Sequence, residues 1–271
     1  MKWADVAGNT IRYEFRPGSG IPAAGTPAAG EPVVFIHEMG GSLNSWDRLL
    51  SRAEITRPVL RYDTRGCGMS EKLRDVPTMD ELADDLVQLL ELVGIQGPVT
   101  LAGCATGSAV ALTCAARHPQ SVSAVVAMSP VTEVAVARRL TLLDVGDRME
   151  RHGLRSIVDA SLATSYAPAL VDDQEVFNEF RARWLANDPT SFAYQYRMLA
   201  DLDIRGAFDQ VACPVLVMSG RHDPLRPPAL SKGVASKLAR ASYVELDTGH
   251  FMHVQAPAQV ARTLNEFLNT V

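Results

Sequence analysis

Apolar and polar residues follow two different patterns along the chain, and each pattern predicts a kind of strand. Near the N-terminus they alternate, at residues 2–6 and 10–15 with Gly8-Asn9 between them, which predicts a β-hairpin. From residue 32 onward, apolar residues gather in short and nearly continuous runs. Such runs are typical of strands in a parallel sheet that is covered on both faces. They lie at 32–37, 58–63, 98–103, 122–128 and 214–220.

Helical segments alternate with these runs. Thr78 followed by Glu81 is a capping-box pattern, and leucines and valines recur after it at helical spacing. The alternation predicts an α/β protein with a doubly wound, mostly parallel sheet. Residues 131–205 have helical periodicity without a convincing strand. We therefore expect a helical cap at 131–205, inserted into a core made of residues 1–130 and 206–271. The Pro-, Gly- and Ala-rich stretch 17–32 predicts a long loop.

Composition and charge exclude several classes of protein. The chain has 271 residues, 47% hydrophobic and 21% charged, which excludes a disordered or fibrous protein. A formal net charge of -5 argues against a nucleic-acid partner. No signal-peptide core and no membrane-spanning stretch are evident, so we expect a cytoplasmic protein without membrane contact. Cysteines 67, 104, 114 and 213 form no metal-binding spacing, which favours reduced thiols and no metal.

Glycine-rich motifs follow three of the predicted strands. Because the carboxyl ends of parallel strands lie at one edge of a sheet, these motifs are expected to converge on one site. Ser42 is positioned to cap a helix. A charged hydrogen bond between Asp63 and Arg65 is one way to lock the second loop, although we favour a purely structural turn there. Flanking glycines permit a sharp strand-turn-helix with Ala105 at its apex. The motifs are HEMGGS (37–42), DTRGCGMS (63–70) and AGCATG (102–107).

An aspartate and a histidine follow the last two predicted strands. Asp223 lies in GRHDP after the run at 214–220, and His250 lies in DTGHFMH after the strand YVEL. An Asp beyond one strand and a His beyond the next is the arrangement that holds an imidazole in one tautomer. We therefore expect an Asp223–His250 pair. The neighbouring His253 is expected to be a packed or exposed structural histidine, and His37 to be buried and hydrogen-bonded.

The order HxxGG, DxRGxGxS, GxxxG elbow, GxxD and TGH resembles the α/β-hydrolase family over nearly the whole chain. Within that family, LRYDTRGCGMSEK and TGHFMHVQAP look most like the 3-oxoadipate enol-lactonase group. The resemblance implies a hydrolase of a small ester, lactone or amide that needs no cofactor. It places the nucleophile at position 105, the base at His250 and the aspartate that orients this base at Asp223. The N–H groups of Met39 and Thr106 would form the oxyanion hole.

The family pattern breaks at the nucleophile, because Ala105 carries a methyl group that cannot attack a carbonyl. Two explanations stay open: an engineered serine-to-alanine change and a natural loss of the nucleophile. Cys104 ranks first among poor substitutes. An alternative function is a cofactor-free, non-covalent enzyme of the decarboxylase or lyase type, with His250 and Asp223 as general base. A non-catalytic ligand-binding protein is a further alternative, against which the intact Asp–His pair argues.

Several further residues are candidates for contact with a small-molecule substrate. Glu38 follows His37 where relatives often have glycine, and we favour a role in bracing the loop over a role as a base. The cap has arginines but no lysine, and arginine suits bidentate binding of a carboxylate. Arg138 and Arg197 are therefore candidates for binding an acidic substrate, and Trp184 for lining the pocket. A homodimer is an open possibility.

Overall fold

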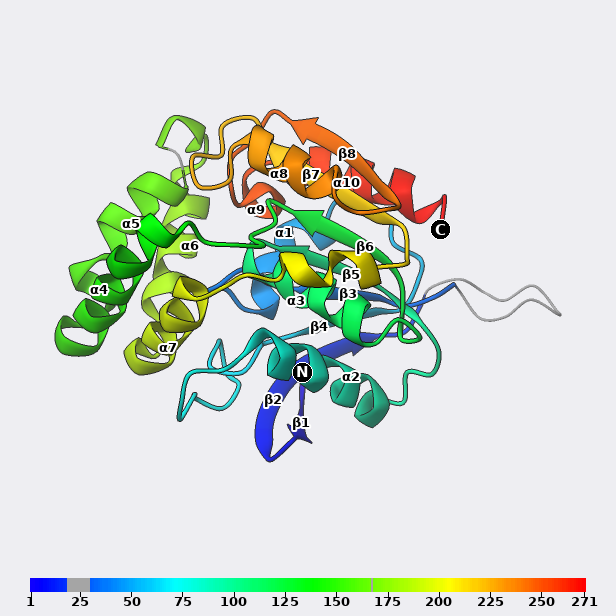
Figure 1. Cartoon of the computed structure of the whole chain (residues 1–271), viewed down its shortest axis with the longest axis horizontal. Helices are drawn as coiled ribbons and strands as arrows, with labels where there is room; N and C mark the ends of the chain where they lie inside the picture. The colour runs from blue at the N-terminus through cyan, green and yellow to red at the C-terminus, as the bar shows by residue number, and fades with distance from the viewer. Residues whose placement is uncertain (19–29, 167) are drawn as a thin grey trace, which may run out of the picture.

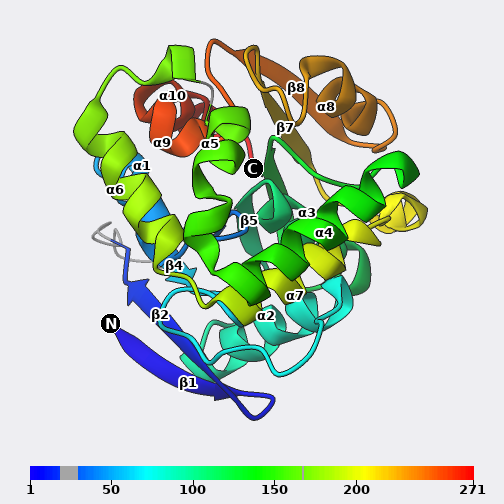
Figure 2. The same cartoon turned by 90° about the vertical axis from the view of Figure 1, so that its left-hand side faces the viewer.

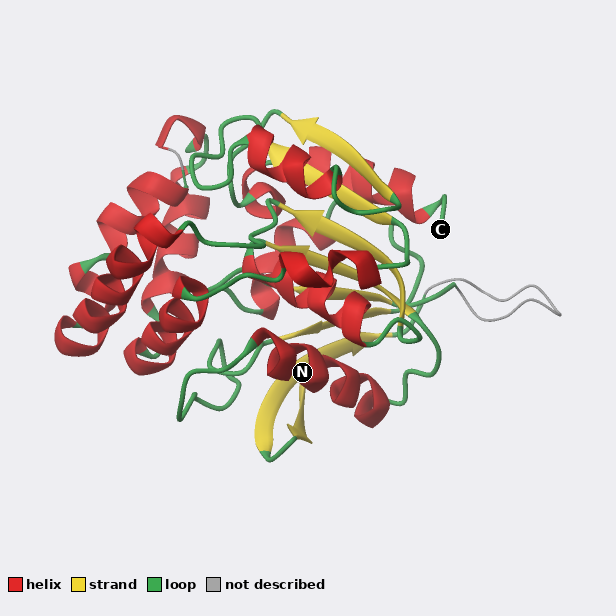
Figure 3. Ribbon diagram, viewed as in Figure 1, coloured by secondary structure: helices red, strands yellow, loops and turns green. Residues whose placement is uncertain are grey.

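The computed structural model describes residues 1–18, 30–166 and 168–271, and its centre is an eight-stranded sheet (Figures 1 and 3). The strand order is β1-β2-β4-β3-β5-β6-β7-β8. β1 and β2 form the predicted hairpin and β2 pairs antiparallel with β4, whereas the remaining pairs are parallel. The strands are β1 (Lys2–Val6), β2 (Asn9–Arg16), β3 (Val33–Ile36), β4 (Val59–Tyr62), β5 (Val99–Cys104), β6 (Val122–Met128), β7 (Val215–Gly220) and β8 (Ala241–Leu246). The prediction of a mostly parallel α/β sheet is confirmed.

Helices cover both faces of this sheet, because successive side chains of the central strands point to opposite faces. Leu101 and Val125 pack with α2, α3 and α8, whereas Ala102 and Val126 pack with α1, α9 and α10. The central strand β5 is buried along its whole length, which explains its continuous apolar run. The helices are α1 (Asp47–Leu50), α2 (Met79–Val93), α3 (Thr106–Arg117), α8 (Pro228–Ala235), α9 (Met252–Gln255) and α10 (Pro257–Leu268).

Local sequence signals fix the ends of several of these elements. Thr78 Oγ1 accepts from the Glu81 N–H at 3.1 Å, and the Glu81 carboxylate accepts from the Thr78 N–H at 2.7 Å. This is the predicted capping box of α2. Ser42 caps a 3₁₀ helix in the same reciprocal way with Ser45, as its position predicted. The 3₁₀ helices are η1 (Leu43–Trp46), η2 (Leu154–Ser156), η3 (Pro168–Leu170) and η4 (Arg205–Gln210).

A separate group of helices lies beyond the carboxyl ends of the parallel strands (Figures 1 and 2). It falls within the predicted cap segment, although the boundaries 131 and 205 stay a prediction. The group has its own apolar cluster, which includes Met149, Phe180, Trp184 and Phe192 and continues onto Phe251 of the core. Its helices are α4 (Val136–His152), α5 (Val158–Ser165), α6 (Gln174–Leu185) and α7 (Pro189–Ala200).

Two further observations complete the fold. Most of the predicted loop at 17–32 lies outside the described residues. Among the helices of the described residues, none combines the length and the apolar character that a membrane crossing would require.

Candidate active site

A strained turn joins β5 to α3, and Ala105 lies at its apex with φ 52° and ψ −114°. Non-glycine residues rarely adopt this conformation, which costs on the order of 1–3 kcal/mol. The flanking glycines make the turn possible. A Cβ at Gly103 would overlap the carbonyl of Gly107, and a Cβ at Gly107 would overlap the carbonyl of Ile36. The steric reason predicted for these glycines is thus confirmed, and the turn keeps its strain although residue 105 has no hydroxyl.

The Asp223–His250 pair follows β7 and β8 at the same edge of the sheet. His250 Nδ1 lies 2.7 Å from Asp223 Oδ2, and both side chains are buried. The other carboxylate oxygen accepts backbone N–H groups of Leu225 and Arg226 at 2.9 and 2.8 Å. Burial alone would raise the pKa of Asp223, but the hydrogen bond and charge of His250 hold it below its ordinary value. An ionised Asp223 accepts a hydrogen bond from Nδ1–H of His250, so Nε2 of the neutral imidazole is left as a proton acceptor.

Cys104 places the turn next to His250 but does not replace the nucleophile. Its Sγ donates to the backbone carbonyl of His250 at 3.7 Å, and its side chain has no exposed surface. Burial, together with the Glu38 and Asp223 carboxylates, raises the pKa of the Cys104 thiol well above its usual value. Since the thiolate is the nucleophilic form, this buried thiol is inert.

Two backbone N–H groups are candidate donors to a substrate: that of Met39 in the loop after β3 and that of Thr106 at the start of α3. Among the described residues, the N–H groups of Met39 and Thr106 have no hydrogen-bond acceptor. Gly40 has a φ of 77°, and a Cβ there would lie 2.6 Å from Cζ of Phe192 in the cap. His37 anchors the loop as expected: Nδ1 donates to the Glu38 carbonyl at 2.7 Å, and Nε2 accepts the Thr64 N–H at 3.0 Å. The loop is therefore anchored at both ring nitrogens of His37, and within the described residues the N–H of its Met39 has no acceptor.

Glu38 lies beneath this loop and is 1% exposed. Its Oε1 accepts from Ser45 Oγ at 2.8 Å, and its Oε2 lies 3.1 Å from His253 Nε2. His253 is fully buried and packs on Trp46, with ring centroids 4.5 Å apart. Burial by itself would raise the pKa of Glu38, but the charge and hydrogen bonding of His253 lower it to about 2. Glu38 therefore ties the loop to the segment that carries the catalytic histidine candidate.

The same motif order is matched by a model of the alpha/beta hydrolase fold, which covers residues 31–257. The chain belongs to the alpha/beta hydrolase fold family. The match spans strands β3 to β8, the turn at Ala105, the inserted helices and the Asp223–His250 pair, and it leaves out the N-terminal hairpin.

Named relatives of this α/β hydrolase are enzymes. It is 25% identical over 245 residues to pyrrolizixenacetamide deacetylase of Xenorhabdus hominickii, covering 87% of this chain and 90% of the relative. It is 22% identical over 226 residues to 3-oxoadipate enol-lactonase 2 of Acinetobacter baylyi, covering 83% and 84%. The enol-lactonase structure from Burkholderia xenovorans LB400 has the same fold, with a TM-score of 0.89, 23% identity and coverage of 99% and 100%. The resemblance to the enol-lactonase group is confirmed.

The cap candidates of this α/β hydrolase lie in different surroundings. Trp184 is buried in the cap cluster, with its ring centroid 4.8 Å from that of Phe192. Arg138 is exposed on α4. Arg197 is paired with Asp147, at 2.9 Å, and with Glu150. Both carboxylates raise the pKa of Arg197 further, so its charge is already engaged between α4 and α7. Substrate contact by these residues stays a prediction.

The idea that Asp63 and Arg65 join through a charged hydrogen bond is wrong. Asp63 instead pairs with Arg12 at 3.2 Å and accepts the Leu43 N–H at 2.7 Å. Arg65 turns away to Asp85, which accepts from its Nε at 2.8 Å. The two residues are neighbours in sequence, but the sheet brings β2 next to β4 and offers Asp63 a partner that proximity in sequence does not reveal.

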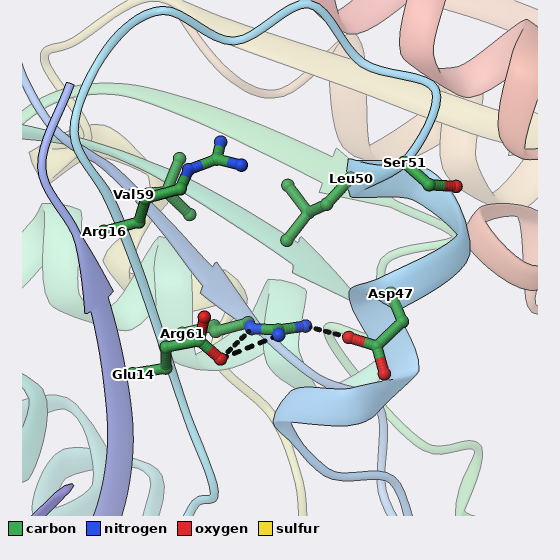
Figure 4. A pocket seen from close by; sticks show the side chains of 7 residues that line it. All are labelled: Glu14, Arg16, Asp47, Leu50, Ser51, Val59 and Arg61. Atoms are coloured by element: carbon green, nitrogen blue, oxygen red, sulfur yellow. Dashed lines mark hydrogen bonds and ion pairs between the residues drawn. The ribbon is translucent and has the colours of Figure 1, made fainter. Parts of the chain in front are cut away.

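A cavity of about 230 Å³ lies between β2, β4 and α1 (Figure 4). Its wall includes Arg61, which lies between Glu14, at 2.7 Å, and Asp47. The Glu14 and Asp47 carboxylates in this wall are therefore both paired with Arg61. In the described part of the chain, no group of three or more His, Cys, Asp or Glu residues is arranged to hold a metal ion.

Two residues near the site escaped the sequence analysis. Ser129 directly follows β6, is fully buried and has a φ of 45°, and its position after a strand was a usable signal. Gln195 comes from α7 and contacts Cys67 of the DTRGCGMS loop at 2.9 Å. No local pattern marks Gln195, because the cap and this loop are joined only by the tertiary fold.

Proposed function

We propose that this α/β hydrolase acts on a small ester, lactone or amide, bound with its carbonyl above Ala105. The 2.7 Å contact between His250 Nδ1 and Asp223 Oδ2 carries the proposal, because it leaves Nε2 as a base at the sheet edge where β3 and β5 lead into Met39 and Thr106. The named relatives, a deacetylase and an enol-lactonase, support the reaction class.

With alanine at 105, the direct route uses water. Nε2 of His250 removes a proton from a water molecule while its oxygen attacks the carbonyl carbon. The N–H groups of Met39 and Thr106 stabilise the negative charge on the former carbonyl oxygen. When the intermediate collapses, His250 returns the proton to the departing alkoxide or amine. Asp223 stabilises the imidazolium and keeps the ring oriented throughout.

With serine at 105, the route would be covalent. The hydroxyl would lose its proton to Nε2 and attack the carbonyl, and water would later release the acyl group with the same base. Loss of a triad nucleophile costs on the order of 10⁶ in turnover in a serine protease, so the alanine chain should be a slow hydrolase.

A second candidate function follows from the alanine itself. A strained turn with a methyl group at its apex fits an enzyme in which His250 removes a proton directly from the substrate, as in a cofactor-free decarboxylase or lyase. Such a site needs no hydroxyl at 105. The two candidates differ in their response when a hydroxyl is supplied.

The experiment compares the parent chain with Ala105→Ser. We expect the serine variant to fold normally, to gain hydrolysis of simple activated esters and to react with a fluorophosphonate probe, because its hydroxyl lies beside His250. Ester turnover and probe labelling are measured side by side. Adding His250→Ala to the serine variant is the control and should abolish both signals. A folded serine variant that is as inert as the parent would reject covalent hydrolysis and favour direct proton removal by His250.

A further inference from the structure

A narrow cavity of about 20 Å³ lies between the cap and the loop after β3. Met39 and Thr106 line it on the core side, and Gln195 and Met198 of α7 line it on the cap side. The remaining wall is mixed: it has polar groups from His37, Glu38, Thr64 and Arg65, and apolar surface from Cys67, Pro77, Leu82, Gly107 and Val110. Space of this size admits roughly one water-sized group, so it can hold a small substituent but not a second ring or chain.

Gln195 contributes a buried amide to this wall. Its side chain is 5% exposed, and its Nε2 lies 2.9 Å from Cys67 Sγ and 3.5 Å from the Arg65 carbonyl. Because a carbonyl oxygen only accepts, the amide nitrogen must face Arg65. The amide oxygen, Oε1, is fully buried and has no hydrogen-bond partner within residues 1–18, 30–166 and 168–271. A buried acceptor without a donor is unfavourable, and such groups in native structures call for a ligand, a water or another explanation.

The charges around the cavity narrow the chemistry of its occupant. The buried carboxylate of Glu38 lines the cavity, and Gln195 Oε1 can only accept, so both groups would repel a carboxylate placed there. Arg65 also lines the cavity, but its guanidinium is paired with Asp85, with Nε 2.8 Å from the carboxylate, and is not free to bind an anion. A short neutral donor, a hydroxyl or an N–H, fits both the size and the polarity.

We propose that Gln195 is a specificity-determining residue, whose Oε1 accepts a hydrogen bond from a hydroxyl or N–H on the acyl part of the substrate. The inference rests on the proposed function for the position of the carbonyl at Met39 and Thr106. It adds the substrate class: acyl groups with a small donor close to the reacting carbonyl, rather than acyl groups that end there in a carboxylate.

Binding of two unreactive analogues tests this without turnover. N-phenylglycolamide and N-phenylpropanamide differ by a hydroxyl in place of a methyl group, and both are titrated calorimetrically into the full chain with Ala105. We expect the glycolamide to bind about tenfold more tightly, the value of one good hydrogen bond to a buried acceptor. Gln195→Met keeps the length of the side chain but removes the acceptor, so it should remove this preference.

Met198→Leu is the matched control, because it alters the same cavity on the same helix without changing its polarity. This variant should keep the preference for the glycolamide, and thermal unfolding verifies that both variants are folded. Equal affinities in the parent chain, no measurable binding of either analogue, or a preference that survives Gln195→Met would each overturn the role of Gln195.

Turnover separates this inference from the proposed function. In the Ala105→Ser background, phenyl glycolate should have a higher kcat/KM than phenyl propanoate, and Gln195→Met should reduce this ratio about tenfold. If neither ester is hydrolysed, the hydrolase proposal fails, and the calorimetric comparison still decides whether Gln195 reads a donor. If both are hydrolysed at a ratio that Gln195→Met does not change, the hydrolase proposal stands and the inference about Gln195 falls.

Discussion

Single residues in this α/β hydrolase explain how a site can keep its framework while lacking a nucleophile. Ala105 retains a strained conformation that costs free energy and serves no purpose for a methyl group alone. The turn leads directly into α3, whose first residue, Thr106, lines the cavity between the cap and the loop after β3. The value of the turn therefore lies in its backbone as much as in the side chain at its apex.

The buried Glu38 carboxylate leads to a prediction about how the stability of the protein depends on pH. Its pKa is about 2 in the folded protein against an ordinary value of 4.5, so its contribution to stability is complete above about pH 4.5 and is lost as the pH falls towards 2. Glu38→Gln should lower the free energy of unfolding at pH 7 by about 3 kcal/mol, because it leaves His253 without its partner. Its stability should also fall less steeply than that of the parent between pH 4.5 and 2.

Urea unfolding at a series of pH values provides the measurement. Glu91→Gln, an exposed carboxylate on α2, is the control and should change the free energy of unfolding little. Parallel pH curves for the parent and Glu38→Gln would contradict the assigned ion pair.

At the scale of elements, the site depends on how closely α3 approaches the sheet. Gly107 in the first turn of α3 lies directly against the end of β3, where a Cβ would overlap the backbone carbonyl of Ile36. Backbone atoms cannot yield as a flexible side chain can. The turn, the helix and β3 are therefore one tightly packed unit, and the two donors of the proposed oxyanion hole belong to segments that join it.

Substitution of helical glycines tests this packing. Gly107→Ala should destabilise the protein by about 3 kcal/mol or more, because either α3 or β3 must move. Gly233→Ala in α8 is the matched control: nothing lies within 4 Å of its added Cβ, so a gain of about 0.5–1 kcal/mol is expected from helix propensity. Chemical denaturation of both variants supplies the comparison. Equal effects at the two positions would show that the close approach to Ile36 is not restrictive.

At the scale of the whole molecule, the cap and the core differ in how much they bury. Along β5 every residue is buried, whereas in α4 only Gly146 and Met149 are. The cap is joined to the loop after β3 by a few polar contacts, such as Asn187 Nδ2 donating to the Gly40 carbonyl at 2.8 Å. Opening of the cap therefore exposes less apolar surface than unfolding of the sheet.

This difference predicts the order of opening. Amide protons of α4 should exchange with solvent at a lower free energy of opening than those of β5, because fewer buried contacts are lost. Native-state hydrogen exchange at increasing urea concentration measures both values. A common opening free energy for the two elements would mean that cap and core unfold as a single cooperative unit.

Sequence alone was sufficient for the strands of the sheet, the helix cap at Ser42, the capping box at Thr78, and the steric need for Gly103 and Gly107. These features depend on local periodicity and turn geometry. The Asp223–His250 pair was also predictable, because both residues follow parallel strands and such strand ends share one edge. Residue roles beyond this pairing remain the proposals made above.

Only the tertiary structure decided which polar side chains meet across elements. Asp63 pairs with Arg12 rather than with Arg65, two residues away, because β2 lies against β4. Glu38 meets His253, and Gln195 reaches Cys67, through contacts between segments far apart in the chain. Such partners depend on strand register and on how the cap sits on the core, and a hydrophobic pattern does not encode either one. The free energy of a buried charge is set by these distant neighbours, so their identity waits on the folded chain.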